Sequence, residues 1–210
     1  MLKIIIADDH PIVRRGLKQI LADTPDLMPA GEAGSGAQLL DMLAHGDFDC
    51  VLLDLSMPGM HGLDVLQKIK REQPRLPVLV ISILPEDQFA ERALRAGAAG
   101  YLPKESSPDE LVSAIRKVCS GGKYMSATMA ENLAKRIQSQ SKETPHETFS
   151  PREFQIFRML VEGKGTKEIA ATTFLSVKTV STYRSRILIK MGMNTNAELT
   201  RYAMQNGLLA

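Results

Sequence analysis

Tryptophan is absent from this sequence of 210 residues, aromatic residues make up only 5% of it, and there are two cysteines. Cys50 and Cys119 lack CxxC spacing and have no nearby cysteine or histidine that could complete a metal site. We expect both to be small buried residues in a reducing compartment. An apolar content of 44% and a charged content of 24% indicate a globular protein.

Long hydrophobic runs are also missing. No uncharged apolar run approaches the roughly 18 residues that a membrane-spanning helix needs. The apolar run Leu2–Ala7 is too short for a signal sequence and ends at Asp8 and Asp9. The sequence therefore predicts a cytoplasmic protein without a membrane partner.

The formal charge of +2 is divided unevenly along the chain. Residues 1–124 carry 14 Lys and Arg against 17 Asp and Glu, a net charge of −3, whereas residues 125–210 carry 12 against 7, a net charge of +5. Residues 125–148 hold three charges of each sign, so the positive excess lies in residues 149–210. This division indicates a nucleic-acid partner for the second part alone.

Residues 1–122 alternate short apolar runs with amphipathic stretches. Five such β/α units predict a doubly wound, five-stranded parallel sheet of the flavodoxin-like class. In sheets of this kind, ligands bind outside the carboxyl ends of the strands. The expected strands are Lys3–Ala7, Met28–Ala33, Cys50–Asp54, Val78–Ser82 and Gly100–Leu102.

Residues 123–148 are expected to connect two domains. A helix is predicted over Met125–Arg136, and the polar run Gln138–Thr148 is predicted to be an exposed, flexible linker. Residues 149–210 then predict a small all-α domain of four helices, with the tight turn between its second and third helices that is typical of a helix-turn-helix. These helices are expected from the capping box Ser150–Glu153 onward, over Lys167–Thr172, over Val177–Met191 and from Thr195 to Gln205.

Three carboxylates follow the first and third predicted strands. Asp8 and Asp9 end the first strand, and Asp54 ends the third. Because the ends of neighbouring parallel strands converge, these carboxylates should meet, and their mutual repulsion requires a cation among them. Oxygen ligands in an open loop suit Mg²⁺, which shares its coordination shell with phosphate.

Two further groups are expected at the same edge of the sheet. Ser82, after the fourth strand, offers a hydroxyl, and Lys104, after the fifth, offers a compact cation for a phosphoryl oxygen. Together with the three carboxylates they indicate an aspartyl-phosphate site in which Asp54 is the nucleophile.

These residues resemble the receiver domain of two-component response regulators over roughly residues 2–122. The resemblance implies that Asp54 accepts a phosphoryl group from a cognate histidine kinase. It also implies that Asp9, Asp54 and the backbone carbonyl of Ser56 hold Mg²⁺, with Asp8 acting through water. The motifs that carry it are Asp8-Asp9, Asp54 with Met57-Pro58-Gly59 and Gly62, Ser82, and Ala96-Gly97-Ala98-x-Gly100-Tyr101-Leu102-x-Lys104.

The same resemblance assigns the switch. Lys104 and Ser82 are expected to contact the phosphoryl group, and Ser82 and Tyr101 to move together. One departure is visible, because Glu105 follows Lys104 where many receivers have a proline in a cis peptide.

Other polar residues near the site have simpler interpretations. A single Asp at a strand end is often only a helix cap. His10 and His61 flank the site and are expected to be loop residues that face solvent. Helix starts are the preferred interpretation of Asp64, Asp87 and Asp109.

The helix predicted over Val177–Met191 has two distinct faces. Helical spacing places Val177, Val180, Tyr183 or Arg184, Ile187 and Met191 inward, and it places Lys178, Ser181, Thr182, Ser185 and Lys190 outward. The chain has no acidic residue between Glu168 and Glu198. A face of hydroxyls and cations without carboxylates favours a helix that enters the major groove of DNA over an ordinary solvated face.

Motifs at fixed spacing across the second part include Phe149-Ser150-Pro151-Arg152-Glu153, Lys167-Glu168-Ile169-Ala170 and Leu175-Ser176-Val177-Lys178-Thr179-Val180. By these motifs, residues 149–209 resemble the helix-turn-helix domain of the LuxR-type regulators. The resemblance implies that Lys178, Thr179 and Arg186 contact DNA phosphates and that the last helix mediates dimer contacts. It also implies that Ser181, Thr182 and Ser185 face the bases. Ser181 and Tyr183 stand where relatives commonly have Lys and His. The further residues expected to bind DNA are Lys167, Arg184 and Lys190.

Both parts together resemble the nitrate-regulator-like response regulators, which implies transcription control by phosphorylation, dimerisation and promoter binding. RNA polymerase is a candidate further partner. Two alternatives remain open. A magnesium-dependent aspartyl-phosphate phosphohydrolase usually has a second Asp where this chain has Ser56. A DNA-binding protein that is independent of phosphorylation would have lost the acid pair, the lysine or the hydroxyl, and this chain keeps them all.

Overall fold

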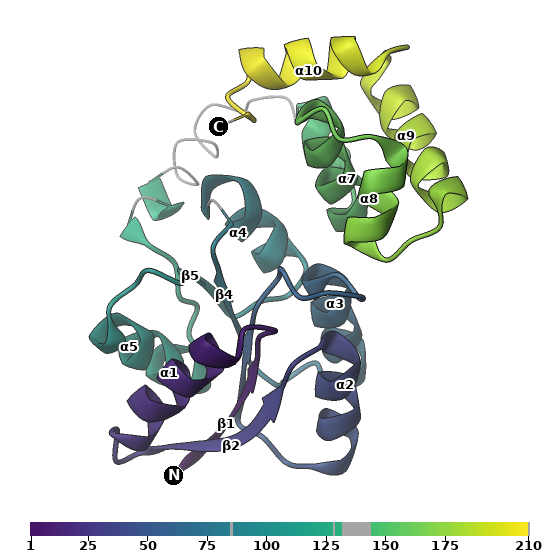
Figure 1. Ribbon diagram of the computed structural model, residues 1–210. Helices are drawn as coiled ribbons and strands as arrows, with labels where there is room; N and C mark the ends of the chain where they lie inside the picture. Colours follow the sequence, from purple (N-terminus) through teal and green to yellow (C-terminus); the bar gives the residue numbers. More distant parts are fainter. Residues whose placement is uncertain (85, 128, 132–143, 210) are drawn as a thin grey trace. The chain divides into compact units, whose positions relative to one another are not determined.

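The computed structural model describes residues 1–84, 86–127, 129–131 and 144–209 (Figure 1). The chain forms two compact units, Met1–Gln138 and Ser139–Ala210. Across the described residues, no helix combines the length and the apolar character needed to cross a membrane.

The first unit is built on a parallel sheet whose strands lie in the order β2-β1-β3-β4-β5. This is the arrangement of a doubly wound, flavodoxin-like sheet, which confirms the predicted class. β3 and β4 are buried along their whole length, which explains their nearly continuous apolar sequences. The strands are β1 (Leu2–Ala7), β2 (Leu27–Ala33), β3 (Cys50–Leu53), β4 (Val78–Ser82) and β5 (Gly100–Pro103).

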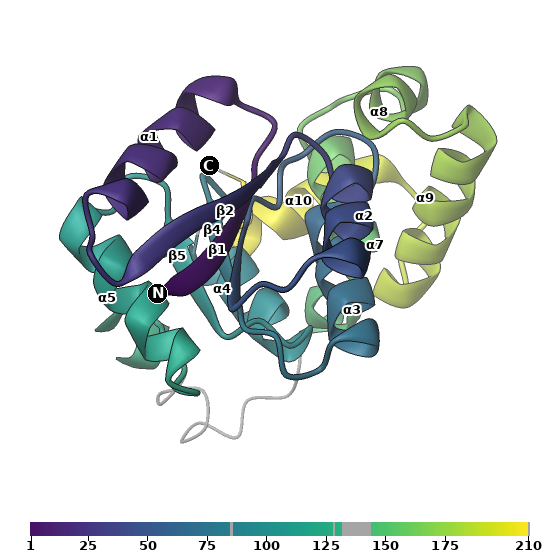
Figure 2. The same cartoon turned by 90° about the horizontal axis from the view of Figure 1, so that it is seen from below.

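Helices cover both faces of this sheet (Figures 1 and 2). The right-handed crossover between parallel strands places a helix on one face or the other according to the direction in which the chain moves along the sheet. The chain moves one way from β1 to β2 and the other way afterwards, so α1 lies opposite α2, α3 and α4. α5 follows the last strand and packs in the same apolar cluster as α1. The helices are α1 (Pro11–Ala22), α2 (Gly36–His45), α3 (Gly62–Glu72), α4 (Glu86–Arg95) and α5 (Pro108–Cys119).

The core of the first unit follows the alternation of side chains along each strand. Ile4 and Ile6 of β1 pack with Leu21 of α1 and Ile115 of α5 in one apolar cluster. Ile5, between them, is just as buried and points to the other face. The polar residues that follow the strands lie outside this core, at the carboxyl edge of the sheet.

The two cysteines differ in their exposure. Cys50 is fully buried in the same apolar cluster, as expected. Cys119 is only half-buried, which corrects the expectation of two buried residues. It is the last residue of α5, so it packs at the edge of the cluster, where the helix meets solvent.

The segment that follows α5 turns back onto the sheet. Tyr124 forms an isolated bridge with Gly100 of the edge strand β5. A Cβ atom at position 100 would lie 2.8 Å from the Tyr124 carbonyl oxygen, so glycine is required for this close approach. Residues 127 and 129–131 are helical, whereas Met125 and Ser126 precede the helix, which corrects its predicted start, and residues 128 and 132–136 lie outside the described residues.

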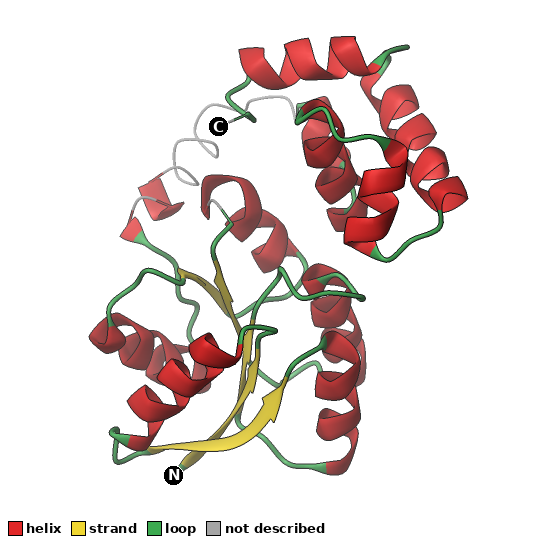
Figure 3. Ribbon diagram, in the orientation of Figure 1, coloured by secondary structure: helices red, strands yellow, loops and turns green. Residues whose placement is uncertain are grey.

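Helices make up most of the described residues of the second unit (Figure 3). Ser150 and Glu153 form the predicted capping box, in which the Glu153 carboxylate accepts the Ser150 N–H at 2.7 Å and the Ser150 hydroxyl oxygen accepts the Glu153 N–H. Its elements are a 3-10 helix η1 (Pro145–Thr148), α7 (Pro151–Val161), α8 (Thr166–Thr173), α9 (Val177–Met191) and α10 (Asn196–Gln205).

A tight turn joins α8 to α9, as the sequence predicted. Phe174 ends α8 in a left-handed conformation with φ of 53°, and Ser176 caps α9 by accepting the Thr179 N–H at 3.0 Å. The Arg152 guanidinium of α7 donates to the Thr173 carbonyl at 2.7 Å and so fixes the end of α8 against α7.

The prediction of an exposed, flexible linker up to Thr148 is wrong for its last residues. Pro145–Thr148 form η1, and His146 Nδ1 lies 2.8 Å from the Tyr202 hydroxyl of α10, with the two rings edge to face. The polar composition of this segment does not predict the contact, because a histidine ring makes it and not an aliphatic side chain. Residues 138–143 of the predicted linker lie outside the described residues.

Candidate functional site

Asp8 and Asp54 are side by side because the β1–β3 pairing continues one residue past both strands. Ala7 pairs with Leu53, and the Asp54 N–H donates to the Ala7 carbonyl at 2.8 Å. The residues after the two strands therefore emerge together at the carboxyl edge of the sheet. The structure brings these two carboxylates together as the sequence predicts.

Lys104 bridges the two carboxylates. Its Nζ lies 2.8 Å from Asp54 Oδ2 and 2.6 Å from Asp8 Oδ2. Only 2% of Asp8 and 1% of Asp54 is exposed, so these charges interact in a poorly solvated place. The Ser56 N–H donates to Asp54 Oδ1 at 3.1 Å and fixes the other carboxylate oxygen.

Burial and the ammonium group act in opposite directions on Asp54. Burial raises the pKa of Asp54, and its hydrogen bond with Lys104 only partly offsets that rise. Burial alone would lower the pKa of Lys104, but the hydrogen bonds to Asp54 and Asp8 prevail and raise it. Lys104 thus remains a cation beside the carboxylate that it contacts.

Asp9 and His10 complete an acidic pocket that fits a divalent metal ion. Ligand atoms of Asp8, Asp9, His10 and Asp54 all lie within 4.8 Å of one another. Asp9 Oδ1 is a buried oxygen that accepts no hydrogen bond among the described residues, although His10 Nδ1 lies 2.9 Å away. Three carboxylates, one of which has a buried oxygen that accepts no hydrogen bond among the described residues, suit a hard cation. His10 is exposed in a loop, as expected, but its ring also contacts Asp8 and Asp9, a contact that residue type alone does not predict.

Ser82 and Tyr101 both contact the residue Leu84 in the β4–α4 loop. The Ser82 hydroxyl oxygen accepts the Leu84 N–H at 3.1 Å, and the Tyr101 hydroxyl donates to the Leu84 carbonyl at 2.7 Å. Both side chains are fully buried. The sequence named the two side chains but missed Leu84, because a backbone contact leaves no signal in residue identity.

The loop that follows Asp54 depends on a glycine and a histidine. A Cβ atom at Gly62 would lie 2.8 Å from the Asp54 carbonyl oxygen, so α3 can begin this close to the site only with glycine. His61 is 3% exposed, and its Nδ1 accepts the Leu63 N–H at 3.2 Å. The expectation that His61 faces solvent is therefore wrong, because its ring caps α3.

A contact that the sequence did not predict joins α4 to the segment after α5. The Ser126 hydroxyl donates to Glu86 Oε2 at 2.7 Å and accepts the Met129 N–H at 3.0 Å. Glu86 is the first residue of α4, two residues beyond Leu84. The loop that Ser82 and Tyr101 contact is therefore connected to the start of the segment that leads out of the first unit.

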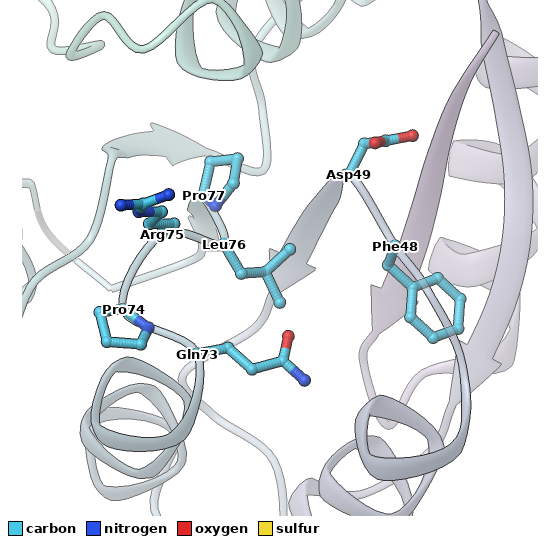
Figure 4. A pocket seen from close by; sticks show the side chains of 7 residues that line it. All are labelled: Phe48, Asp49, Gln73, Pro74, Arg75, Leu76 and Pro77. Atoms are coloured by element: carbon cyan, nitrogen blue, oxygen red, sulfur yellow. The ribbon is translucent and has the colours of Figure 1, made fainter.

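A shallow hollow of about 550 Å³ lies at the opposite edge of the sheet (Figure 4). It is formed where the chain enters β3 and β4, so it is separate from the carboxylates that follow these strands. Its lining residues are Phe48, Asp49, Gln73, Pro74, Arg75, Leu76 and Pro77.

In the second unit, α9 presents the predicted polar face with one correction. The side chains of Val180, Ile187 and Met191 are buried, as expected. Val177 is 42% exposed, so its inward placement is wrong, because the first residue of α9 lies beyond the edge of the small core. The predicted outward residues Lys178, Ser181, Thr182, Ser185 and Lys190 are all exposed, and so are Lys167 and Arg186.

Internal contacts already hold several of the predicted DNA-binding residues. Lys190 Nζ lies 2.6 Å from Glu153 Oε2, and Arg184 Nε donates to Asn196 Oδ1 at 2.7 Å. Thr179 lies 2.8 Å from the Ser176 hydroxyl at the start of the helix. Lys178 lies on the exposed face, in the first turn of α9.

Both units match known protein families. Residues 4–116 match the response regulator receiver domain, and residues 147–203 match the bacterial regulatory proteins of the luxR family. The response regulator GacA of Pseudomonas aeruginosa is 38% identical over 210 residues, which are 100% of this chain and 98% of that protein.

Two solved structures of RcsB are similar over nearly the whole chain. RcsB from Salmonella enterica serovar Typhimurium, bound to a promoter in the presence of the phosphomimetic BeF3⁻, has a TM-score of 0.67 at 26% identity and covers 96% of this chain and 97% of its own. A structure of two RcsB dimers bound to two parallel DNAs has a TM-score of 0.59 at 27% identity and covers 97% and 98%.

Proposed function

This chain belongs to the two-component response regulators that join a receiver domain to a LuxR-type DNA-binding domain, and on that premise we propose that phosphorylation of Asp54 controls its binding to promoter DNA. The observation that carries the proposal is the Asp54 carboxylate, which is buried between Lys104 and the acidic residues Asp8 and Asp9. The proposed receiver spans residues 1–122, the connection 123–148 and the DNA-binding domain 149–210.

The proposed reaction transfers a phosphoryl group from a histidine of the cognate kinase. An Asp54 carboxylate oxygen forms a bond to phosphorus while the bond between phosphorus and the imidazole nitrogen breaks. Lys104, already 2.8 Å from that carboxylate, is placed to neutralise charge on the phosphoryl oxygens. The chain is a transcription regulator, and the catalysis proposed for it is limited to its own phosphorylation and dephosphorylation.

The acidic pocket is proposed to hold Mg²⁺. Asp9 and Asp54 would be its ligands together with the Ser56 carbonyl, and Asp8 would act through water. Asp9 Oδ1 supports this assignment, because it is buried and accepts no hydrogen bond among the described residues, and the basic group beside it, the His10 ring 2.9 Å away, is exposed. Bound Mg²⁺ would neutralise phosphoryl oxygens during transfer.

The proposed switch acts through Leu84. If the Ser82 hydroxyl turns to a phosphoryl oxygen, the Leu84 N–H loses its acceptor, and the loop that Tyr101 also contacts can rearrange. Phosphorylation then favours a second loop conformation only to the extent that the phosphoryl group interacts more strongly with that conformation than with the first.

On the DNA side, we propose that α9 enters the major groove and that phosphorylation promotes a homodimer. A dimer raises the effective concentration of the second DNA-binding domain at an adjacent half-site. The dimeric, DNA-bound RcsB supports this arrangement. The nitrate-regulator-like type, a cytoplasmic location and RNA polymerase as a partner belong to the same proposal.

Acetyl phosphate with Mg²⁺ tests the acceptor directly. Wild type should gain one acid-labile phosphoryl group, about 80 Da by intact mass, and Asp54→Asn should gain none. Asp49→Asn is the matched control, because Asp49 is exposed at the other end of β3 and should leave incorporation unchanged. Equal phosphoryl incorporation by Asp54→Asn and wild type would overturn the assignment of Asp54 as the phosphoacceptor. The alternative of a DNA-binding protein that is independent of phosphorylation at Asp54 would then remain.

A further inference from the structure

A pair of thiols lies at the end of the sheet opposite Asp54. Cys50 is the first residue of β3 and Asp54 follows the last, about 13 Å further along the strand. Cys119 ends α5, which packs against β3. Both side chains pack in the same apolar cluster, and Cys119 Sγ lies 4.0 Å from the carbonyl oxygen of Asp49, the residue before Cys50.

The two sulfur atoms differ in solvent access and in charge. Interaction with the Cys50 thiol lowers the pKa of Cys119, although burial and the Asp49 carboxylate oppose that effect. The same interaction, together with burial, raises the pKa of Cys50. The half-buried Cys119 therefore has the greater thiolate character, while the fully buried Cys50 stays protonated. Reactivity toward oxidants follows thiolate character and access.

We propose that Cys50 and Cys119 form a dithiol that hydrogen peroxide oxidises to an intramolecular disulfide. The Cys119 thiolate attacks one peroxide oxygen, the O–O bond breaks, and hydroxide leaves, so that the sulfur becomes a sulfenic acid and the peroxide is reduced. The Cys50 sulfur then attacks the Cys119 sulfur and forms the S–S bond as the S–O bond breaks. The proton of Cys50 leaves with the hydroxyl group as water, and overall two thiols and one peroxide give one disulfide and two waters.

The crosslink would fasten the end of α5 to the start of β3. After α5 the chain contacts β5 once more, at Tyr124, before it continues toward the DNA-binding unit, so oxidation would fix the helix from which this segment departs. Because the crosslink closes a long loop in the unfolded chain, the thermal midpoint of the oxidised protein should rise by several degrees. The dithiol is independent of the function proposed for Asp54.

The test treats the purified full-length chain with about a tenfold excess of hydrogen peroxide, followed by denaturation and alkylation of the remaining thiols. Wild type should lose both alkylatable thiols, remain a monomer on a non-reducing gel and yield one crosslinked peptide that contains Cys50 and Cys119. Dithiothreitol should restore both thiols. If Cys119 stays reduced, or if it stops at a sulfenic or sulfinic acid while Cys50 remains alkylatable, the proposal is overturned.

Two matched variants separate the roles of the sulfur atoms. In Cys50→Ala, Cys119 should stop at a sulfenic acid that dimedone traps. In Cys119→Ser, Cys50 should remain reduced under the same treatment, because it is fully buried. Rapid oxidation of Cys50 in Cys119→Ser would contradict the order of steps. The wild-type experiment remains decisive if either variant folds poorly.

Discussion

At the scale of single residues, the site depends on one cation between two buried carboxylates. Lys104 contacts both Asp8 and Asp54, and each carboxylate is almost completely removed from solvent. Two buried like charges are unfavourable without such a partner. Lys104 therefore has a structural role in the unphosphorylated protein in addition to the role proposed for it with phosphate.

Lys104→Met should destabilise the first unit by roughly 3 kcal/mol in the absence of divalent cations, because it leaves Asp8 and Asp54 without their shared cation. Millimolar Mg²⁺ should recover more stability in this variant than in wild type, since a bound cation replaces the lost charge. Urea unfolding with and without Mg²⁺ measures both effects.

Lys3→Met is the control for that prediction. Lys3 is exposed on β1, and its replacement should change stability by less than about 0.5 kcal/mol. Equal stability of Lys104→Met and wild type without Mg²⁺ would show that Lys104 does not balance the carboxylates.

Residues at strand ends could be placed from the sequence, whereas their neighbours could not. The sequence predicts that Asp8, Asp54 and Lys104 converge, because each follows a strand of a parallel sheet and the carboxyl ends of these strands lie at one edge. His61 was misplaced because polarity alone does not show that a ring caps a helix. Leu84 was missed because its contribution is a backbone N–H and carbonyl.

At the scale of elements, α9 combines positive charge at its start with hydroxyls along its exposed face. Lys178 is on the first turn, while Thr182 lies one turn later. The Thr182 hydroxyl donates to the Lys178 carbonyl at 3.0 Å, which leaves its oxygen lone pairs toward solvent. The two residues should therefore affect DNA binding in different ways.

Lys178→Ala should weaken binding to selected and random DNA alike and reduce the salt slope by about one unit, because phosphate contacts do not depend on sequence. Thr182→Ala should lower the affinity for selected DNA more than for random DNA, by roughly 1 to 3 kcal/mol for a direct base contact. Salt titrations of both variants on both DNAs make the comparison. The opposite pattern would mean that the roles of the two residues have to be exchanged.

Element boundaries were predictable wherever a cap and an apolar period coincide. The capping box of Ser150 and Glu153 correctly predicts the start of α7, and Asp109, which is expected at a helix start, lies in the first turn of α5. Pro145–Thr148 have the polar composition of a linker, but they form η1 and contact Tyr202 through a histidine ring. Val177 was misplaced for another reason: it fits the helical spacing of the apolar residues in α9, but it lies past the edge of the small core and is exposed.

At the scale of the whole molecule, the account requires that the receiver communicate with the DNA-binding unit. Within the first unit, contacts run from Ser82 and Tyr101 through Leu84 to α4, and from Glu86 to Ser126. Ser126 also caps the helical stretch that begins the connection to the second unit. A change that reaches Ser82 thus has a set of neighbouring contacts through which to reach the connecting segment.

The affinity of the full-length chain for DNA, with and without phosphorylation, tests the central claim most directly. DNA enriched by the phosphorylated protein from a random-sequence library serves as the probe, and fluorescence anisotropy gives the Kd. Acetyl phosphate and Mg²⁺ should lower the Kd of wild type by at least about fivefold and leave that of Asp54→Asn unchanged. The same Kd for wild type in both states, or the same decrease in Asp54→Asn, would contradict control of DNA binding through Asp54.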